Sequence, residues 1–446
     1  MNKTIITVRE AALDVLEKID KQQSYSNLLL NQVIQKGKIK GPDIGLLTEI
    51  VYGTIQRKMT LDYYLQPFLR KKPENWVLNL LRLSLYQMVY LDKIPERAIF
   101  YEAVEIAKKR GHKGIASFVT GILRRIQREG IRSLDLIEDP LEKLAISTSH
   151  PLWLVKRWHE QLGLQKTEEM CKHNLHAPVQ AARVNLHKAS KEEVIRLLSE
   201  EGFNVEESSI VPEAIRVLRG NIAHSDVYKK GYVSIQDESS MAVGHALTIS
   251  PNLKVLDACA APGGKTGHIA ELLKGTGRVI ALDLHPHKIK LIQENADRLG
   301  LANIDAQVMD SRELSRKFKS ESFDRILVDA PCSGLGVLRR KPDIKYTKNE
   351  QDVLSLSKVQ LNILNESADL LKKGGILVYS TCTVDQDENF GVVHHFLEQH
   401  SDFEPQPLQL PVTLSKFVGS SSHTLQILPQ DFGGDGFFIA SFKKKD

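Results

Sequence analysis

Two of the four cysteines in this chain of 446 residues lie immediately after apolar stretches that have the composition of buried strands. Cys332 follows FDRILVDAP, and Cys382 follows GGILVYST. A single cysteine in such a place is ordinarily a small buried hydrophobe. Two cysteines in equivalent places indicate chemistry instead, because a thiolate is a strong nucleophile and also a good leaving group.

Such a pair suits methylation of a carbon that is not nucleophilic by itself, and C5 of cytosine is one example. A nucleophile must first add to C6, and after methyl transfer the C5 proton and the bond to C6 must both be lost. A thiol with a pKa of ~8.5 is only a few per cent ionised at neutral pH, so the site must favour the thiolate. The chemistry leaves open which thiol attacks and which assists release.

The two cysteines follow the last members of a series of apolar strands that alternate with helical segments. This alternation predicts an α/β Rossmann-like domain with a parallel, doubly wound sheet, which binds ligands at the carboxyl ends of its strands. Four of the strands end in an aspartate, which favours a bound ligand at that edge. The predicted strands are 253–258, 278–283, 304–310, 323–330 and 374–381, and the aspartates are Asp257, Asp283, Asp310 and Asp329.

The first strand runs into the small-residue loop CAAPGGKT, residues 259–266. A P-loop would need a glycine where Cys259 stands, and the glycines at 263, 264 and 267 match a dinucleotide fingerprint poorly. Such a loop instead lets a ligand approach the backbone and a helix N-terminus. We expect Asp283 to accept hydrogen bonds from a ribose diol and Asp310 to accept them from an adenine amine. The pattern predicts S-adenosylmethionine as cofactor and a class I methyltransferase.

The rest of the chain predicts two further domains. Residues 8–127 read as successive helices, and we place an all-α domain at 1–135 and a linker at 136–150. Residues 151–230 predict a small α+β, RRM-like module, in which Ser190 and Glu193 form a capping box. The methyltransferase domain then occupies 231–446.

Composition excludes several classes of protein. Hydrophobic residues make up 42% and charged residues 26% of the chain, which is ordinary for a globular protein. The sequence has no apolar stretch long enough for a signal peptide or a membrane span, so we expect a cytoplasmic protein without a membrane partner. No CxxC pair occurs, so we expect no zinc ribbon, no metal and no disulfides.

The net charge of +5 is unevenly distributed, because residues 1–150 carry 24 Lys and Arg against 17 Asp and Glu. This excess favours a polyanionic partner, although solvated helix surfaces are an equal alternative. The basic clusters are 70–72, 108–110 and 124–125.

Four motifs resemble the RNA cytosine-5 methyltransferase family that includes the Sun/RsmB (Fmu) and Nop2/NSUN proteins. They are CAAPGGKT at 259–266, DAPCSG at 329–334, RRKPDIK at 339–345 and STCT at 380–383. The helical stretches 47–53, 81–87 and 103–109 are similar to the NusB-like RNA-binding domain of the Sun/RsmB branch.

The resemblance implies roles that spacing does not give. It implies that Cys382 attacks C6, that Cys332 assists release of the product, and that Asp329 and Lys265 orient or protonate the pyrimidine ring. It also implies which residues line the cofactor: Cys259, Ala260, Ala261, Pro262, Gly263, Gly264, Lys265, Asp283, Asp310 and Asp329.

The resemblance further implies a substrate, a specific cytosine of bacterial 16S rRNA in naked or early-assembly form. The base must be unstacked to expose both faces of its ring. Arg339, Arg340 and Lys341 would hold its phosphates, unless they are simply a solvated charge run. We expect a monomer. Two alternatives stay open at this point: a tRNA cytosine-5 methyltransferase, and a non-enzymatic RNA-binding or antitermination factor.

Overall fold

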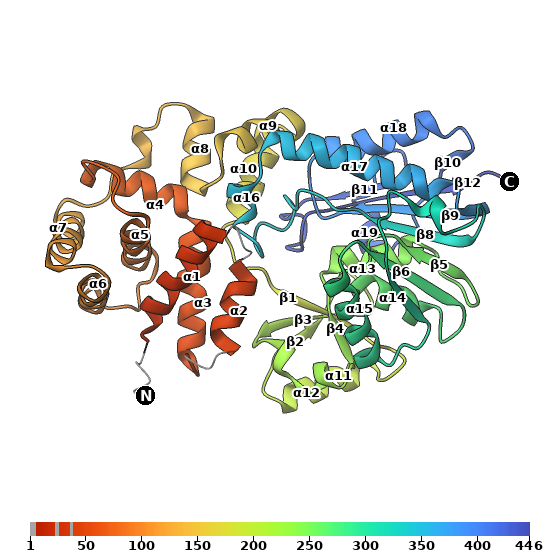
Figure 1. The fold of residues 1–446 in the computed structure, drawn as a ribbon, viewed down its shortest axis with the longest axis horizontal. Helices are drawn as coiled ribbons and strands as arrows, with labels where there is room; N and C mark the ends of the chain where they lie inside the picture. The colour runs from red at the N-terminus through yellow and green to blue at the C-terminus, as the bar shows by residue number, and fades with distance from the viewer. Residues whose placement is uncertain (1–5, 23–25, 36–38) are drawn as a thin grey trace. The chain divides into compact units, whose positions relative to one another are not determined.

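The computed structural model describes residues 6–22, 26–35 and 39–446, which form two compact units (Figure 1). The helical unit comprises residues 1–177 together with 338–349, and the sheet unit comprises 178–337 and 350–446. The chain therefore passes from the sheet unit into the helical unit at residue 338 and returns to the sheet unit at residue 350. The predicted domain boundaries at 135, 150 and 230 remain predictions. In the described ranges, every helix is too short or too polar to span a bilayer.

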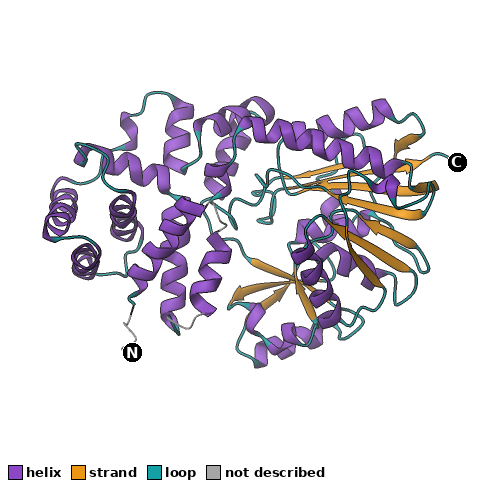
Figure 2. Cartoon of the chain, viewed as in Figure 1, coloured by secondary structure: helices purple, strands orange, loops and turns teal. Residues whose placement is uncertain are grey.

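The helical unit consists of helices and their connections (Figure 2), and its helices between residues 8 and 129 share one hydrophobic core. In α7, for example, Ala116, Val119, Leu123 and Ile126 are buried at helical spacing. The α-helices are α1 (Val8–Gln22), α2 (Ser26–Gln35), α3 (Pro42–Gln56), α4 (Lys58–Leu65), α5 (Asn75–Tyr90), α6 (Glu96–Arg110), α7 (Lys113–Glu129), α8 (Pro140–Thr148), α9 (Leu152–Leu162), α10 (Leu164–His173) and α16 (Ile344–Thr347). Short 3-10 turns occupy Gln66–Phe68 and Leu134–Leu136.

The sheet unit begins with a small module whose antiparallel sheet has the order β2-β3-β1-β4. The predicted capping box is present, because Ser190 Oγ accepts a hydrogen bond from the Glu193 backbone N–H at 3.2 Å. Its elements are β1 (Gln180–Val184), α11 (Lys191–Glu200), β2 (Asn204–Glu207), β3 (Ala214–Arg219), the 3-10 turn Ile222–His224, α12 (Asp226–Lys229) and β4 (Val233–Ile235).

The large sheet follows the order β10-β12-β9-β8-β5-β6-β7, with β11 paired to β12. The five predicted strands are present and parallel, but the sheet is mixed, because β12 and β10 add to it antiparallel. The predicted parallel, doubly wound arrangement is therefore present, and the antiparallel strands extend it at one edge. The strands are β5 (Lys254–Asp257), β6 (Arg278–Asp283), β7 (Ile304–Val308), β8 (Phe323–Asp329), β9 (Leu371–Thr381), β10 (Phe403–Pro405), β11 (Thr424–Ile427) and β12 (Phe437–Lys444).

Helices cover both faces of this sheet, with α17 and α18 on one face and α13 to α15 on the other (Figure 1). Successive strand residues alternate between the two cores: Leu256 packs with the α17 and α18 side, and Val255 packs with the α13 and α14 side. The flanking elements are α13 (Glu238–Ala246), α14 (Gly264–Leu272), α15 (Pro286–Leu299), the 3-10 turn Leu314–Arg316, α17 (Glu350–Ala368), the π-helical turn Asp387–Gly391, α18 (Val392–Gln399) and α19 (Val412–Ser415).

Candidate functional site

The parallel pairing of β8 with β9 brings the two strand-end cysteines together. Asp329 is paired with Ser380 in the register of the two strands, so both chains leave the sheet at the same edge. Cys332 lies three residues after Asp329 and Cys382 two residues after Ser380, and their Sγ atoms are 3.3 Å apart. Both thiols are partly exposed. Both sulfur atoms can therefore act on the same part of one substrate.

A close backbone approach holds the two cysteine loops against each other. Gly336, four residues after Cys332, donates its N–H to the Cys382 carbonyl at 3.0 Å and accepts from the Gly436 N–H at 2.9 Å. A Cβ atom added at Gly336 would lie 2.1 Å from the Gly436 carbonyl oxygen. Any side chain at this position would therefore push the loops apart.

Lys265 and Asp329 form an ion pair beside the thiols. Lys265 Nζ lies 2.8 Å from Asp329 Oδ2, and Ser380 Oγ donates to Asp329 Oδ1 at 2.8 Å. Burial alone would lower the pKa of Lys265, but the Asp329 carboxylate, Cys382 and Asp257 outweigh it, and the pKa is raised. Lys265 therefore stays an ammonium ion, and its charge favours the anionic form of the Cys382 thiol.

Cys332 has the opposite electrostatic surroundings. Its pKa is raised well above the ordinary value, first by the hydrogen bond with Cys382, then by burial and by the negative charges of Cys382 and Glu388. These effects favour the neutral thiol at Cys332.

The predicted cofactor loop precedes α14 and contains a backbone conformation that favours glycine. Gly263 has a φ of 101°, and a Cβ atom there would lie 3.2 Å from the backbone of Ile292. At Gly264, the first residue of α14, an added Cβ would meet nothing within 4 Å. The open surface at this helix N-terminus fits a ligand with negative or hydrogen-bond-accepting groups.

Asp257 lies beneath this loop and is fully buried. Its Oδ2 accepts a hydrogen bond from Thr266 Oγ1 at 2.7 Å, but its Oδ1 has no hydrogen-bond partner of ordinary geometry among the described residues. Burial raises the pKa of Asp257 to about 7, assisted by the negative charge of Asp329. An unsatisfied buried carboxylate oxygen is costly, and a positively charged ligand group would relieve that cost. The sequence placed Asp257 among the four strand-end aspartates at the ligand edge but gave it no contact with the cofactor.

The two remaining acidic positions differ in their availability. Asp283 ends β6, is almost buried, and accepts the His285 backbone N–H at 3.0 Å, with Lys288 Nζ 3.6 Å away. Asp310 follows β7 and is engaged by the guanidinium of Arg312 at 2.6 Å. The hydrogen bonds from Arg312 hold the pKa of Asp310 below its usual value. A ligand amine at Asp310 would therefore share the carboxylate with Arg312.

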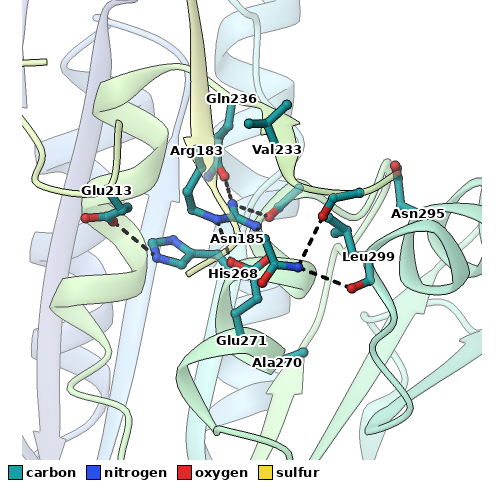
Figure 3. Close-up of polar contacts among 12 residues, drawn as sticks. Arg183, Asn185, Glu213, Val233, Gln236, His268, Ala270, Glu271, Asn295 and Leu299 are labelled. Atoms are coloured by element: carbon teal, nitrogen blue, oxygen red, sulfur yellow. Dashed lines mark hydrogen bonds and ion pairs between the residues drawn. The ribbon is translucent and has the colours of Figure 1, made fainter. Parts of the chain in front are cut away.

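A buried arginine of the small module forms hydrogen bonds with helix α14 (Figure 3). Arg183 on β1 is 1% exposed and forms a bidentate ion pair with Glu271 on α14, at 2.9 and 3.0 Å. Its guanidinium also donates to the Gly264 carbonyl at 3.1 Å and to Gln236. Arg183 thus forms hydrogen bonds near both ends of the helix that follows the predicted cofactor loop. No local sequence signal pointed to this residue.

A second set of contacts holds the small module against the same region. Asn185 Nδ2 donates to the Gly231 and Leu299 carbonyls at 3.3 and 3.2 Å, and Glu213 accepts from His268 (Figure 3). Glu213 also accepts from His245 at 2.9 Å. The hydrogen bonds from the two histidines outweigh burial and lower the pKa of Glu213. The module therefore acts as a rigid support for α14.

The basic residues that the sequence assigned to RNA have varied surroundings. Arg339 is 7% exposed and its guanidinium lies 2.5 Å from His173 Nε2 inside the helical unit, which contradicts a solvated charge run and does not suit a phosphate contact. Arg340 and Lys341 are half-buried. In the cluster 108–110, each basic residue pairs with a carboxylate of the helical unit. Residues 70–72 and 124 remain exposed.

The described residues contain no group of three or more His, Cys, Asp or Glu side chains that could hold a metal ion.

Three family models match the chain. Residues 245–443 match 16S rRNA methyltransferase RsmB/F, residues 6–128 match the NusB family, and residues 150–222 match the ferredoxin-like domain of the RsmF/B-like methyltransferases. The predicted fold classes of the three parts are therefore confirmed.

The chain is also similar along its whole length to curated and solved proteins. It is 55% identical over 100% of both chains to the probable ribosomal RNA small subunit methyltransferase B of Bacillus subtilis. It is 33% identical to the protein of that name from Synechocystis, over 99% of this chain and 100% of the relative. The crystal structure of PH0851 matches with a TM-score of 0.85 and 27% identity, over 99% of this chain and 98% of that one.

Replacing Arg183 with Met should lower the free energy of unfolding by about 3–5 kcal/mol, because Glu271 would be left buried without its partner. The double variant Arg183→Met, Glu271→Met should recover much of this loss. Urea-induced unfolding measures both. Arg196→Met is the matched control, since its ion pair with Glu200 is exposed and should contribute less than about 1 kcal/mol. A similar loss in Arg196→Met and Arg183→Met would contradict the assignment.

Proposed function

Because this chain belongs to the RsmB/F family of methyltransferases, we propose that it methylates C5 of one specific cytosine in 16S rRNA through a covalent bond between Cys382 and C6. The observation that carries this proposal is the pair of thiols at 3.3 Å beside the Lys265–Asp329 ion pair. A methyltransferase that acts on an amino group or a hydroxyl needs no such pair, because those acceptors are nucleophilic themselves.

The cofactor that fits the sheet edge is S-adenosylmethionine, which supplies an electrophilic methyl group when bound. We assign its binding to the loop 259–265, with Asp283 for the ribose hydroxyls and Asp257 for a positively charged group. The open surface at Gly264 and the unsatisfied Oδ1 of Asp257 support this assignment. Asp310 is assigned to the adenine amine, in competition with Arg312.

In the first chemical stage, the Cys382 thiolate adds to C6 of the cytosine, and the electrons of the C5–C6 double bond move toward C5. Lys265 favours the thiolate by its charge, and the Lys265–Asp329 pair is placed to orient the ring and to share a proton with it. C5 is then nucleophilic and would take the methyl group, whose bond to the cofactor sulfur would break with its electron pair left on that sulfur. Asp329 is itself fixed by Ser380, so the pair has one arrangement.

In the second stage, the C5 proton is removed, its electrons restore the C5–C6 double bond, and the bond from C6 to Cys382 breaks. We assign Cys332 to this stage, because it lies in contact with the leaving sulfur and its surroundings keep it in the thiol form. The Cys332 thiol gives its proton to the leaving Cys382 sulfur, and the Cys332 thiolate that results takes up the C5 proton.

The named relatives act on ribosomal RNA, and this favours rRNA over tRNA for this chain. The contact between two partly exposed thiols disfavours a non-enzymatic RNA-binding factor, which has no need of it. We expect the protein to act in the cytoplasm as a monomer on naked or early-assembly 16S rRNA. Methylation of purified 16S rRNA but not of purified tRNA would distinguish the two substrates.

The Cys382→Ala variant should form no adduct with RNA and no 5-methylcytosine, a loss below the detection limit of bisulfite sequencing, because nothing can add to C6. Cys171→Ala is the matched control. Burial raises the pKa of Cys171 to about 12, so this thiol is inert, and its variant should methylate within about twofold of the wild type. Formation of 5-methylcytosine by Cys382→Ala would refute the assignment of the nucleophile.

The Cys332→Ala variant should add to the RNA and methylate it but release it slowly. A denaturing gel of the variant with 16S rRNA and cofactor should show a slow-migrating protein–RNA band that the wild type shows only in traces. Treatment with ribonuclease should abolish the band. Rapid turnover without any such band would show that Cys332 plays no part in release.

Cofactor affinity should increase with pH because Asp257 has a pKa of about 7. A carboxyl group with a raised pKa is protonated below that pH, and a positively charged cofactor binds the ionised form better. The affinity should therefore rise by on the order of tenfold between pH 6 and 7.5. Calorimetric titration with S-adenosylmethionine measures this, and Asp257→Asn should lose the increase. The same pH dependence in both proteins would exclude Asp257 as its source.

A further inference from the structure

The π-helical turn Asp387–Gly391 lies directly after the loop that carries Cys382. Its wide hydrogen bond is formed by the Gly391 N–H and the Gln386 carbonyl at 2.9 Å, an i to i+5 spacing. Single π turns of this kind occur frequently at functional sites. Two of its side chains, Glu388 and Asn389, are fully buried and are not used by the chemistry described above.

Glu388 holds the residue that follows Cys332. Its Oε1 accepts the Ser333 backbone N–H at 2.8 Å, and its Oε2 accepts the Ser333 hydroxyl at 2.5 Å. Gln360 on α17 donates both to Glu388 Oε1 at 2.9 Å and to the Pro331 carbonyl at 3.0 Å. Glu388 and Gln360 therefore fix the backbone on both sides of Cys332.

Asn389 does the same for Cys382. Its Oδ1 accepts the Thr381 hydroxyl at 2.6 Å, and its Nδ2 donates to the Thr383 carbonyl at 3.1 Å and to Gln426 at 2.9 Å. The residues before and after Cys382 are thus held by one side chain. The hydrogen bonds around Cys332 and those around Cys382 are also connected, because the Ser333 and Thr383 hydroxyls are 2.9 Å apart.

From this arrangement, we propose that Glu388 and Asn389 are positioning residues for the two thiols, Glu388 for Cys332 and Asn389 for Cys382. The inference rests on the proposed function, since it assigns each residue to the stage in which its cysteine acts. Catalytic groups must be held within about 0.5 Å of the productive geometry, and neighbours fixed by buried hydrogen bonds provide that. Adjacent residues of one short turn thereby control two separate chemical stages.

The test separates the two stages in single-turnover reactions of the full-length enzyme with 16S rRNA and S-adenosylmethionine. Adduct formation is followed by denaturing gel after rapid quenching, and adduct decay by chasing with excess unlabelled rRNA. Glu388→Ala should slow adduct decay by about tenfold or more and change its formation by less than about threefold. Asn389→Ala should show the reverse pattern, because misplacement of a reacting group costs rate at the step that uses it.

A conservative replacement distinguishes positioning from general destabilisation. In Glu388→Gln the amide oxygen can accept from Ser333 N–H and Gln360, and its NH2 can donate to the Ser333 hydroxyl. In this variant the rate of adduct decay should therefore lie within about threefold of the wild-type rate, because the hydrogen bonds to Ser333 and Gln360 remain. Glu398→Ala on α18 is the control, since Glu398 is exposed and pairs with His394 and His395 of its own helix. It should match the wild type in both stages.

Thermal unfolding and cofactor binding, measured for each variant, show whether the variant is still folded. Equal slowing of both stages by Glu388→Ala and Asn389→Ala, or a Glu388→Gln variant as defective as Glu388→Ala, would overturn the inference. If the wild type itself forms neither an adduct nor 5-methylcytosine, the proposed function fails. A wild type that does form both, with variants that lack the crossed pattern, would refute the positioning roles alone.

Discussion

The parallel pairing of β8 with β9 is the constraint on which the rest of the site depends. Neighbouring strands lie about 4.8 Å apart, so loops that leave them at the same edge begin side by side. Cys332 and Cys382 lie within three residues of a paired position, and their contact follows from the register of Asp329 with Ser380. A shift of one residue in the pairing of β8 with β9 would turn their side chains to opposite faces of the sheet and separate Asp329 from Ser380.

Helix α14 connects this sheet edge with the small module. Its first turn carries Lys265, which pairs with Asp329, and its last turn carries Glu271, which pairs with Arg183. The same helix follows the glycine loop and covers the buried Asp257, which Thr266 contacts. The proposed cofactor loop, Lys265 and the contact with the small module therefore all depend on this one helix. A displacement of α14 would change the proposed cofactor surface and the charge beside Cys382 together, and the buried ion pair with Arg183 opposes such a displacement.

The sequence predicted those parts of the molecule that local patterns determine. Apolar runs located the five parallel strands, and the equivalent positions of Cys332 and Cys382 after two of them indicated chemistry at that edge. Arg183 could not be found in this way, because its partner Glu271 is 88 residues away and a lone arginine in a short strand has no distinguishing pattern. The run RRKPDIK misled for a related reason. A basic run resembles a solvated surface, whereas Lys345 within it is buried and donates to the Gln56 carbonyl at 2.9 Å.

The loop that carries Cys332 is held by contacts within the sheet unit. Asp329, where the loop leaves the sheet, accepts a hydrogen bond from Ser380. Further along the loop, Ser333 is fixed by Glu388, and Gly336 is fixed by the Cys382 backbone. A loop anchored at its start and in its middle has few conformations left to lose when substrate binds, and a pre-ordered group gives up less entropy in the reaction. The order of the DAPCSG motif therefore depends on contacts from residues far away in the sequence.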